Sequence, residues 1–270
     1  MPVEFFKTHK ISSNQLPGQI VFSSSSTSGK GESLHYVADL NIYQKSFEKA
    51  FELFYGDIKE YCFIALLPSY LERQGSSLIM MCDELIKKSA HPLSGFYLNE
   101  YDKLAEVLNQ LKEKKQKTIL LGVTFALLDF AAKYPIDLPG LIIMETGGMK
   151  GRGKELTRNE MHKILRGSFG VNAIHSEYGM TELLSQAYAK ADGIFECPSW
   201  MKIIISDIND PFRIRQTGQS GIINIIDLAN IYSCCFIQTS DIGKLRDEGR
   251  FEVLGRLDNS DLRGCSLLAL

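Results

Sequence analysis

The stretch Tyr178-Gly179-Met180-Thr181-Glu182 decides how the chain is interpreted. An apolar run, Val171 to Ile174, comes just before it and is typical of a buried strand. Gly179 allows a sharp turn where a larger side chain would clash. Thr181 then offers a hydroxyl and Glu182 a carboxylate, groups that can contact a phosphate oxygen and hold Mg²⁺. Taken alone, the stretch is equally typical of an ordinary corner between a strand and a helix.

The bulk composition narrows the class of protein. The 270 residues carry a net charge of −2, with 44% hydrophobic and 23% charged side chains, as in many globular enzymes. The near-neutral charge predicts neither nucleic acid nor acidic lipid as a partner. No apolar run approaches the ~20 residues that span a bilayer, and the first residues lack the pattern of a signal peptide. We therefore expect a cytoplasmic protein with no membrane partner.

The cysteines indicate neither disulfides nor a zinc site. None of the six forms a CxxC pair or a Cys/His cluster with zinc spacing. In a reducing compartment most are expected to be small buried apolar residues. The six are Cys62, Cys82, Cys197, Cys234, Cys235 and Cys265.

Strands and helices alternate through the middle of the chain. Continuous apolar runs predict strands buried on both faces, and apolar residues at helical spacing predict the helices between them. The predicted strands are 20–22, 61–67, 118–122, 141–144 and 171–174, and the predicted helices are 37–54, 76–89, 101–115, 123–133 and 157–169. This alternation predicts an α/β fold with a mostly parallel, helix-flanked sheet.

After Cys197-Pro198 the pattern changes to short β-rich runs separated by Gly, Asn and Asp. The runs 201–206, 221–228, 233–239 and 250–254 predict a smaller antiparallel β subdomain. We therefore divide the chain into an α/β region, residues 1–197, and a β-rich subdomain, residues 198–270. The first 20 residues are expected to form an irregular lead-in.

A serine-rich segment follows the first predicted strand. Six consecutive hydroxyl residues, Ser23 to Ser28, lead into Gly29-Lys30-Gly31. Small side chains let backbone N–H groups point into a concavity, and the hydroxyls add donors for phosphate oxygens. The alternative is a flexible serine linker. The segment is not a Walker A loop, because Ser24 and Gly31 stand where that motif needs Gly and Ser or Thr.

Four such features are predicted at strand ends or turns, where ligands bind in open α/β sheets. They are the serine segment, Gly147-Gly148, the stretch Tyr178 to Glu182, and Thr239-Ser240-Asp241. Asp241 follows a predicted β run, where a carboxylate can accept hydrogen bonds from ribose hydroxyls or simply sit in a turn. His35 and His175 lie nearby in sequence, and we expect both to be structural.

In this order, and followed by Gly255-Arg256-Leu257-Asp258, these motifs resemble the adenylate-forming superfamily, which includes the acyl-CoA synthetases and luciferase-type enzymes. The resemblance covers nearly the whole chain. Within that superfamily, the segments Pro2 to His9 and Asp261 to Cys265 look most like the acyl-protein synthetases, the fatty-acid-activating component of bacterial luminescence systems.

The resemblance implies a reaction: a carboxylate attacks the α-phosphorus of ATP, giving an acyl-adenylate and pyrophosphate, with Mg²⁺ as cofactor. Glu182 would hold Mg²⁺, Thr181 would contact the α-phosphate, and Tyr178, with Gly179 and Met180, would contact the base. Gly147 and Gly148 would line the adenine slot, while Asp241 and Arg256 would bind the ribose. The implied contacts to the β- and γ-phosphates come from Ser24, Ser25, Thr27, Ser28 and Gly29.

Cys265 is implied as the acyl acceptor. An acyl-protein synthetase moves its acyl group to a cysteine of its own near the C-terminus, and Arg263 would favour the thiolate form of Cys265. The substrate would then be a fatty acid, with an acyl-accepting protein or reductase as a further candidate partner. The alternative is an ordinary cysteine in a terminal tail.

The sequence also departs from the superfamily pattern. Ser26 replaces the usual loop glycine, the Pro-Lys that commonly follows is absent, and Ser240 stands in the Thr-Gly-Asp motif. The mobile C-terminal domain with its adenylation lysine does not follow Asp258. Two alternatives therefore stay open: a nucleotide- or acyl-binding module with incomplete or no catalysis, and a fragment of an aryl-acetate-type CoA ligase.

Overall fold

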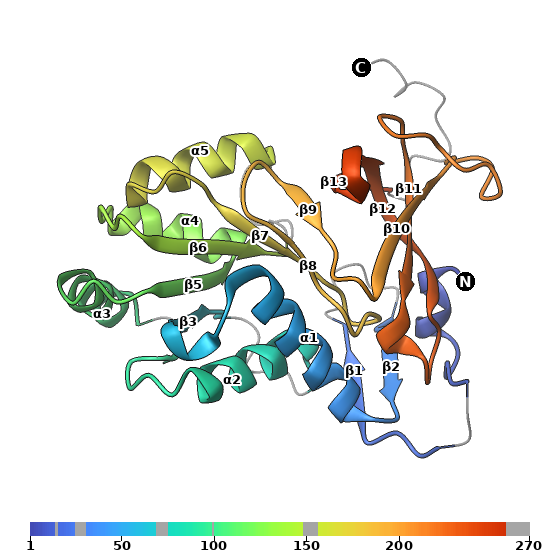
Figure 1. The fold of residues 1–270 in the computed structure, drawn as a ribbon, viewed down its shortest axis with the longest axis horizontal. Helices are drawn as coiled ribbons and strands as arrows, with labels where there is room; N and C mark the ends of the chain where they lie inside the picture. Colours follow the sequence, from blue (N-terminus) through green and yellow to red (C-terminus); the bar gives the residue numbers. More distant parts are fainter. Residues whose placement is uncertain (14–15, 25–30, 69–74, 99, 148–155, 258–270) are drawn as a thin grey trace.

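The computed structural model describes residues 1–13, 16–24, 31–68, 75–98, 100–147 and 156–257. Eleven strands of this part form one sheet in the spatial order β10-β11-β12-β13-β9-β8-β7-β6-β5-β3-β4. A separate two-stranded sheet pairs β1 (Ile20–Ser23) with β2 (Leu34–Val37). The expected α/β class with a mostly parallel sheet and a later antiparallel region is confirmed (Figure 1).

The parallel half of the large sheet is a buried layer between helices. Every residue of its strands β3 and β5 is buried, because helices cover both faces. Its strands are β3 (Cys62–Leu66), β4 (Gly95–Phe96), β5 (Thr118–Val123), β6 (Leu141–Thr146) and β7 (His175–Tyr178). Neighbouring carboxyl ends lie level, with Val123 opposite Thr146 and Thr146 opposite Glu177.

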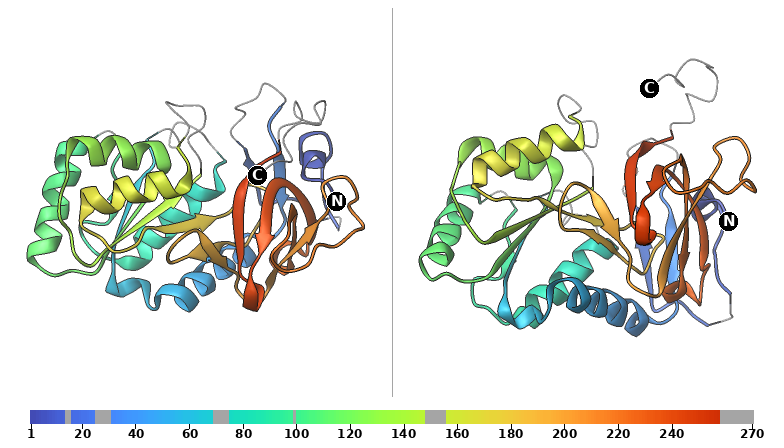
Figure 2. Two further views of the ribbon diagram at one scale, coloured as in Figure 1. Left: turned by 90° about the horizontal axis from the view of Figure 1, so that it is seen from above. Right: turned by 45° about the horizontal axis from the view of Figure 1, so that its top comes forward.

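Five α-helices flank these strands. The pair α4 and α5 lies on one face of the parallel strands, and α1 and α2 lie on the other (Figures 1 and 2). The helices are α1 (Leu40–Tyr55), α2 (Ser77–Ser89), α3 (Tyr101–Glu113), α4 (Thr124–Lys133) and α5 (Arg158–Phe169). In the part of the chain that the structure describes, no helix is long and apolar enough to cross a membrane.

Helix ends follow their capping residues. A capping box is present at α5, where Thr157 and Glu160 bind each other's backbone N–H groups. The predicted helix start at Val37 is wrong, because Asp39 caps the helix by accepting a hydrogen bond from the Asn41 N–H. Val37 instead ends β2, where it pairs with Ile20.

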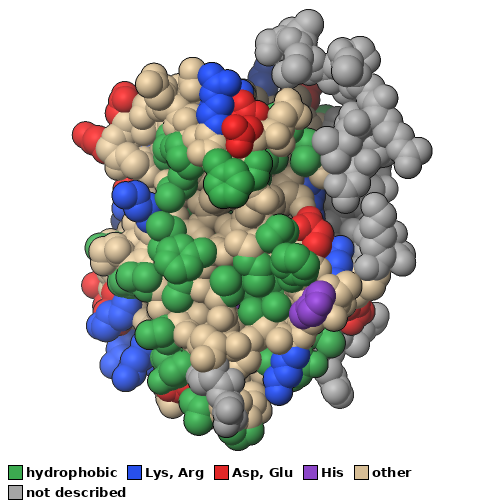
Figure 3. All heavy atoms as spheres, turned by 90° about the vertical axis from the view of Figure 1, so that its right-hand side faces the viewer, with side chains coloured by type: hydrophobic (Ala, Val, Ile, Leu, Met, Phe, Trp, Pro, Cys, Tyr) green, Lys and Arg blue, Asp and Glu red, His purple; other side chains and the backbone are tan. Residues whose placement is uncertain are grey.

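The antiparallel half begins at β8 and has its own core. That hydrophobic cluster is separate from the core of the parallel half and includes Phe195, Ile205, Ile223 and Phe251. The strands are β8 (Ala187–Ala189), β9 (Ile194–Glu196), β10 (Met201–Ser206), β11 (Ser220–Asp227), β12 (Phe236–Leu245) and β13 (Phe251–Arg256). On the face of the molecule at this end, hydrophobic side chains are plainly visible (Figure 3).

Short 3-10 helices complete the described structure: η1 (Val3–Lys7), η2 (Ile58–Glu60), η3 (Leu228–Asn230) and η4 (Asp247–Gly249). The first of these corrects the expectation of an irregular lead-in. Val3 and Phe6 of η1 are buried in the core of the antiparallel half. The proposed division at residues 197 and 198 stays a prediction.

Two predicted strands are shifted in the structure. The apolar run 171–174 is not a strand; the strand is the more polar β7 (His175–Tyr178), which starts where His175 pairs with Met144. The run 233–239 starts and ends too early, since β12 extends from Phe236 to Leu245. Asp241 therefore lies within a strand, opposite Arg256 on β13, rather than in a turn.

Candidate active site

The turn after β7 stands where the large sheet changes from parallel to antiparallel. Met180 accepts a hydrogen bond from the Leu183 N–H at 3.0 Å, which closes the turn. A Cβ atom on Gly179 would lie 2.5 Å from Oε1 of Glu177. The prediction that a side chain at Gly179 would clash agrees with this close approach.

Asp227 anchors the segment that follows the turn. Its fully buried carboxylate accepts hydrogen bonds from the N–H groups of Leu184 and Ser185, at 2.9 and 3.1 Å. It also accepts the Ser185 hydroxyl at 2.6 Å and the Ala229 N–H at 3.1 Å. Burial raises the pKa of Asp227, while these hydrogen bonds act in the opposite direction. The carboxylate thus ties the turn to the end of β11.

His35 connects the turn to the strand that follows the serine segment. Its Nδ1 lies 2.9 Å from the Thr181 carbonyl oxygen, and its Nε2 lies 3.0 Å from the Ser233 hydroxyl. A carbonyl can only accept, so Nδ1 carries the proton and Nε2 accepts from Ser233. Burial lowers the pKa of His35 to about 4, which keeps the ring neutral near pH 7. His35 has a positioning role, as expected for a structural histidine.

Glu182 lies at the base of the site and is only 7% exposed. Burial raises the pKa of its carboxyl group, and a hydrogen bond from Ser33 together with the charges of Arg256 and Lys7 opposes that rise. Its carbonyl oxygen accepts the Asn230 side-chain N–H at 2.8 Å. The carboxylate is therefore held beside two cations without an ion pair within 4.0 Å to any described residue.

The serine segment starts next to Glu182. The Ser24 N–H donates to the Ser33 carbonyl at 3.1 Å, and the Ser33 N–H donates to the Ser24 hydroxyl at 2.9 Å. Because Ser33 also binds the Glu182 carboxylate, Ser24 and Glu182 share a neighbour. The other residues predicted from this segment, Ser25, Thr27, Ser28 and Gly29, lie outside the described residues, as do Gly148 and Cys265.

Tyr178, Asp241 and Arg256 form a second contact group. The Tyr178 hydroxyl donates to Asp241 at 2.7 Å, and Nε of Arg256 lies 4.0 Å from the other Asp241 oxygen. The ring of Tyr178 packs edge-on against Phe195 and Phe251. Burial raises the pKa of Asp241, and the Tyr178 hydrogen bond and Arg256 partly offset that effect. Because Arg256 also acts on Glu182, the two groups adjoin each other.

Gly147 lies at the carboxyl end of β6. Its carbonyl oxygen accepts the Thr124 hydroxyl at 3.0 Å, and its φ of 65° is a conformation that favours glycine. At the end of the same strand, the Thr146 hydroxyl donates to buried Glu177 on the neighbouring strand β7. Burial raises the pKa of Glu177 to about 7, with the Thr146 hydrogen bond opposing the rise. The ends of β6 and β7 are thus joined just below the turn.

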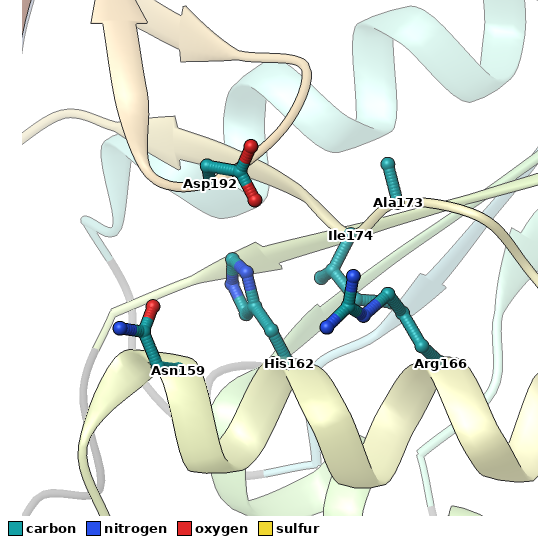
Figure 4. Close-up of a pocket in the computed structure, with 6 residues that line it drawn as sticks. All are labelled: Asn159, His162, Arg166, Ala173, Ile174 and Asp192. Carbon is teal, nitrogen blue, oxygen red and sulfur yellow. The ribbon is translucent and has the colours of Figure 1, made fainter.

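A cavity of the described chain lies elsewhere. It has a volume of about 260 Å³ and is lined by Asn159, His162 and Arg166 of α5, by Ala173 and Ile174, and by Asp192 of the β8–β9 turn (Figure 4). None of the predicted site residues lines this groove. Beside it, the Glu145 carboxylate at the end of β6 lies 3.8 Å from His162 Nε2.

The structure therefore brings the described candidates together as one set of neighbours. Ser24, Glu182, Tyr178, Asp241 and Arg256 are connected through Ser33 and Arg256, and Thr181 lies within the turn that they surround. Gly147 lies one strand away. The role of each in binding or catalysis stays a prediction.

Sequence reasoning missed the residues that support this arrangement. Ser33, Asp227 and Asn230 stand far along the chain from their partners, so no local pattern indicates them. The sequence singles out Lys7 only as part of the segment Pro2 to His9, which resembles the acyl-protein synthetases. A buried polar residue such as Glu177, which interrupts a strand, is the one local signal that could have been used.

The described residues supply one carboxylate ligand for Mg²⁺, so the ion would need substrate phosphates and water as its other ligands. A magnesium ion is usually held by one or two carboxylates together with substrate phosphates and water. Glu182 supplies one nearly buried carboxylate beside the serine segment. Among the described residues, no group of three His, Cys, Asp or Glu side chains forms a metal cluster.

Comparisons with known proteins give similarities in sequence and in fold. No protein-family model matches the chain. A long-chain-fatty-acid–luciferin-component ligase of Vibrio harveyi is 25% identical over 137 residues, which cover 47% of this chain and 35% of that protein. The chain thus matches about a third of this curated relative's length.

Solved structures share the fold at lower identity. ATP-bound MatB from Rhodopseudomonas palustris is 15% identical, with a TM-score of 0.66 over 87% of this chain and 47% of that protein. O-succinylbenzoate coenzyme A synthetase from Bacillus subtilis, in complex with ATP and a magnesium ion, is 18% identical, with a TM-score of 0.57 over 87% and 49%.

A luciferase-like enzyme of the mealworm Zophobas morio has a TM-score of 0.59 at 15% identity, over 92% of this chain and 59% of that one. The sequence match and the shared fold agree with the resemblance to the adenylate-forming superfamily.

Proposed function

We propose that this chain takes part in the ATP-dependent activation of a carboxylic acid as an acyl-adenylate. The observations that carry the proposal are the hydrogen bonds of Ser24 with Ser33 and of Tyr178 with Asp241, together with the buried Glu182 carboxylate, on which Ser33 and the charge of Arg256 act. The fold shared with ATP-bound ligases supports it. The chain spans about half of those structures, so the activity of the whole enzyme is part of the proposal.

In this proposal the two contact groups divide the nucleotide between them. Asp241 and Arg256 bind the ribose and Tyr178 contacts the base, next to the slot formed by Gly147. Ser24 and the remaining serine segment bind the β- and γ-phosphates, and Thr181 contacts the α-phosphate. The Glu182 carboxylate, buried beside Ser33, holds Mg²⁺ against the phosphates in this proposal.

The reaction requires no proton transfer to the protein. A carboxylate oxygen of the acid forms a bond to the α-phosphorus of ATP, and the bond from that phosphorus to the bridging oxygen breaks. Pyrophosphate leaves with the electron pair. Mg²⁺ would supply charge stabilisation, while this chain's hydroxyl and N–H donors orient the phosphates and exclude water.

The finer assignments are proposals as well. We propose a fatty acid as the substrate and transfer of the acyl group to a thiol, with Cys265 as the acceptor and an acyl-accepting protein or reductase as a partner. The name of the Vibrio harveyi relative supports the fatty acid. A cytoplasmic location follows from the same assignment.

A second candidate is a nucleotide-binding module without catalysis. Ser26 in place of the usual loop glycine and the absent Pro-Lys favour it. The two candidates differ in chemistry rather than in binding, because both need the same nucleotide contacts.

Exchange of labelled pyrophosphate into ATP tests the proposal. We expect exchange that depends on a long-chain fatty acid and on Mg²⁺. Thr181→Ala and Glu182→Ala should each lower the exchange rate by at least ~100-fold, the scale for loss of a transition-state contact. Thr217→Ala and Glu113→Ala, both at exposed positions, are the matched controls and should keep the wild-type rate.

The results of the exchange experiment distinguish the two candidate functions. ATP binding without exchange for any acid supports the module. Exchange that survives both substitutions at the turn contradicts the assigned roles of Thr181 and Glu182. For the acceptor, Cys265→Ser should retain exchange but lose covalent acyl labelling, with Cys234→Ser as the control; labelling that persists in Cys265→Ser excludes this cysteine.

A further inference from the structure

Arg158, the first residue of α5, connects the two halves of the large sheet. Its Nη1 donates a hydrogen bond to the Val253 carbonyl on β13 at 2.9 Å. Its Nε lies 3.5 Å from Oε1 of Glu145, near the carboxyl end of β6. One side chain therefore contacts a strand of the parallel half and a strand of the antiparallel half.

The surroundings of Arg158 hold its side chain in this position. The guanidinium carbon lies 5.4 Å from the ring centroid of Phe195 on β9, within the range of a cation–π contact. In the turn between β8 and β9, a Cβ atom on Gly193 would lie 2.7 Å from Cδ of Arg158. The side chain is 30% exposed. The ring, the ion pair and the close turn thus restrict where the guanidinium group can lie.

The contact with Glu145 leads to the proposed adenine slot. Glu145 is 4% exposed, and a buried carboxylate of this kind is costly unless it is paired. The Thr124 hydroxyl lies 3.4 Å from Oε2 of Glu145 and 3.0 Å from the Gly147 carbonyl oxygen. Nε2 of His162 lies 3.8 Å from Oε1. The ion pair with Arg158 therefore helps to fix the end of β6, next to Gly147.

The contacts on the other side lead to the proposed ribose contacts. Val253 lies on β13 together with Arg256, which stands opposite Asp241 of β12. The ring of Phe195, beside the guanidinium group, packs edge-on against Tyr178 with centroids 5.9 Å apart. The Tyr178 hydroxyl in turn donates to Asp241. The same guanidinium group therefore touches two supports of the Asp241 carboxylate.

We propose that Arg158 is a positioning residue that fixes the adenine slot at Gly147 relative to the ribose contact at Asp241. The inference rests on the proposed function. Base and ribose belong to one nucleoside, so the groups that bind them must be held at a fixed separation. Arg158 acts through Glu145 on one side and β13 on the other, and it touches no part of the nucleotide.

Other roles of Arg158 predict different results. A residue that only stabilises the fold would change the unfolding temperature and leave the affinity of the folded protein unchanged. A residue that contacts phosphate would weaken binding of inorganic tripolyphosphate and spare adenosine. The positioning role predicts the reverse, because adenosine needs both the base slot and the ribose contact, whereas tripolyphosphate needs neither.

Calorimetric titration of the whole chain with adenosine and with magnesium tripolyphosphate tests the proposal. Arg158→Met keeps much of the apolar stem and removes the guanidinium group. We expect it to weaken adenosine binding about tenfold, the lower end of the scale for loss of an outer support of a binding site. Binding of tripolyphosphate should stay within about twofold of the wild type.

Arg158→Lys separates the charge from the connection. Lysine keeps a positive charge for Glu145 but lacks the planar fork that reaches Val253 as well. We expect this variant to unfold near the wild-type temperature and still to show the loss of adenosine affinity. It also keeps the proposal testable if Arg158→Met does not fold.

The control is Arg166→Met, at an exposed position of the same helix. It should bind both ligands like the wild type. Adenosine binding that is unchanged in the Arg158 variants overturns the positioning role, and so does an equal loss for adenosine and tripolyphosphate. A wild type that fails to bind either one of the two ligands contradicts the proposed nucleotide site itself, and the role of Arg158 falls with it.

Discussion

The strands in the two halves of the large sheet are buried in different ways. In the parallel half, β3 and β5 are buried along their whole length, and helices cover both faces of the strands. In the antiparallel half burial alternates along the strands, and large apolar side chains such as Phe236, 61% exposed, face outward. Polar residues that are fully or nearly buried gather between the halves, at Glu177, Glu182, Ser185, Asp227 and Asn230.

The difference shows where the fold tolerates polar groups. The turn that joins the two halves is held by hydrogen bonds to the buried side chains of Asp227 and Asn230. A buried polar group without partners costs free energy, so such a network is stable only when it is complete. We infer that the turn between the two halves, together with the buried polar side chains that hold it, is the part of the molecule most sensitive to substitution. We call this part the join.

The largest expected effect is at the hub of this network. Asp227→Ala removes four hydrogen bonds and leaves the N–H groups of Leu184 and Ser185 buried without an acceptor. The free energy of unfolding should fall by about 4 kcal/mol, measured by urea denaturation. Asp129→Ala, at an exposed position of α4, is the control and should have little effect. An equal loss of unfolding free energy in both variants would show that the join is no more sensitive to substitution than an exposed position of α4.

The next effect depends on pH. The folded-state pKa of Glu177 is raised to about 7 from 4.5, so the folded protein binds the proton more tightly than the unfolded chain does. Its charge therefore destabilises the fold increasingly between pH 4.5 and 7 and not below. Glu177→Gln removes this penalty. Relative to the wild type, the variant should gain about 3 kcal/mol between pH 4.5 and pH 8.

Urea denaturation of both proteins at the two pH values measures this gain. Glu113→Gln, on the solvent-exposed side of α3, serves as the matched control and should show no pH-dependent gain. If Glu177→Gln follows the wild type at both pH values, the carboxyl group is ionised at no cost and the description of the join as a strict hydrogen-bond network is wrong.

A smaller effect is expected on the antiparallel side of the join. Tyr178→Phe removes the hydroxyl that donates to Asp241 at 2.7 Å and leaves the carboxylate with Arg256 alone. The unfolding free energy should decrease by about 1–2 kcal/mol. Tyr36→Phe is the control, because Lys10 contacts its ring rather than its hydroxyl. If Tyr178→Phe and Tyr36→Phe have the same unfolding free energy, the hydrogen bond between Tyr178 and Asp241 does not contribute to the stability of the network.

The smallest effect is expected far from the join. Phe212 is 92% exposed in the connection between β10 and β11. Phe212→Ser should change the unfolding free energy by less than about 0.5 kcal/mol, as measured by urea denaturation. A loss as large as that of Tyr178→Phe would mean that this apolar residue is covered by a contact between copies of the chain, which sedimentation analysis would reveal.

The apolar strands of the parallel half could be predicted from sequence because burial on both faces leaves a continuous apolar run, as in 61–67. The shift at β7 could not, since His175, Glu177 and Tyr178 satisfy their polar groups through partners from other elements. The same holds for Asp241 within β12. The helix η1 is too short to show a helical period.

Within the candidate site, the residues of the turn could be predicted from a local motif and a family resemblance. Their supports could not, because His35 and Thr181 are 146 positions apart and Asp227 and Ser185 are 42 apart. Nothing in the local sequence around His35 or Asp227 indicates which backbone groups they bind. The function of the site therefore depends on contacts that only the folded chain reveals.

The hydrogen bond from His35 to the Thr181 carbonyl has a mechanical consequence. The strand that carries His35 also receives the chain from the serine segment, so a displacement of that strand must move the Thr181 backbone or break a buried bond. The two segments behave as one rigid unit. A ligand that orders one of these segments would therefore order the other as well. The conformational entropy cost would be incurred once for both segments rather than separately for each.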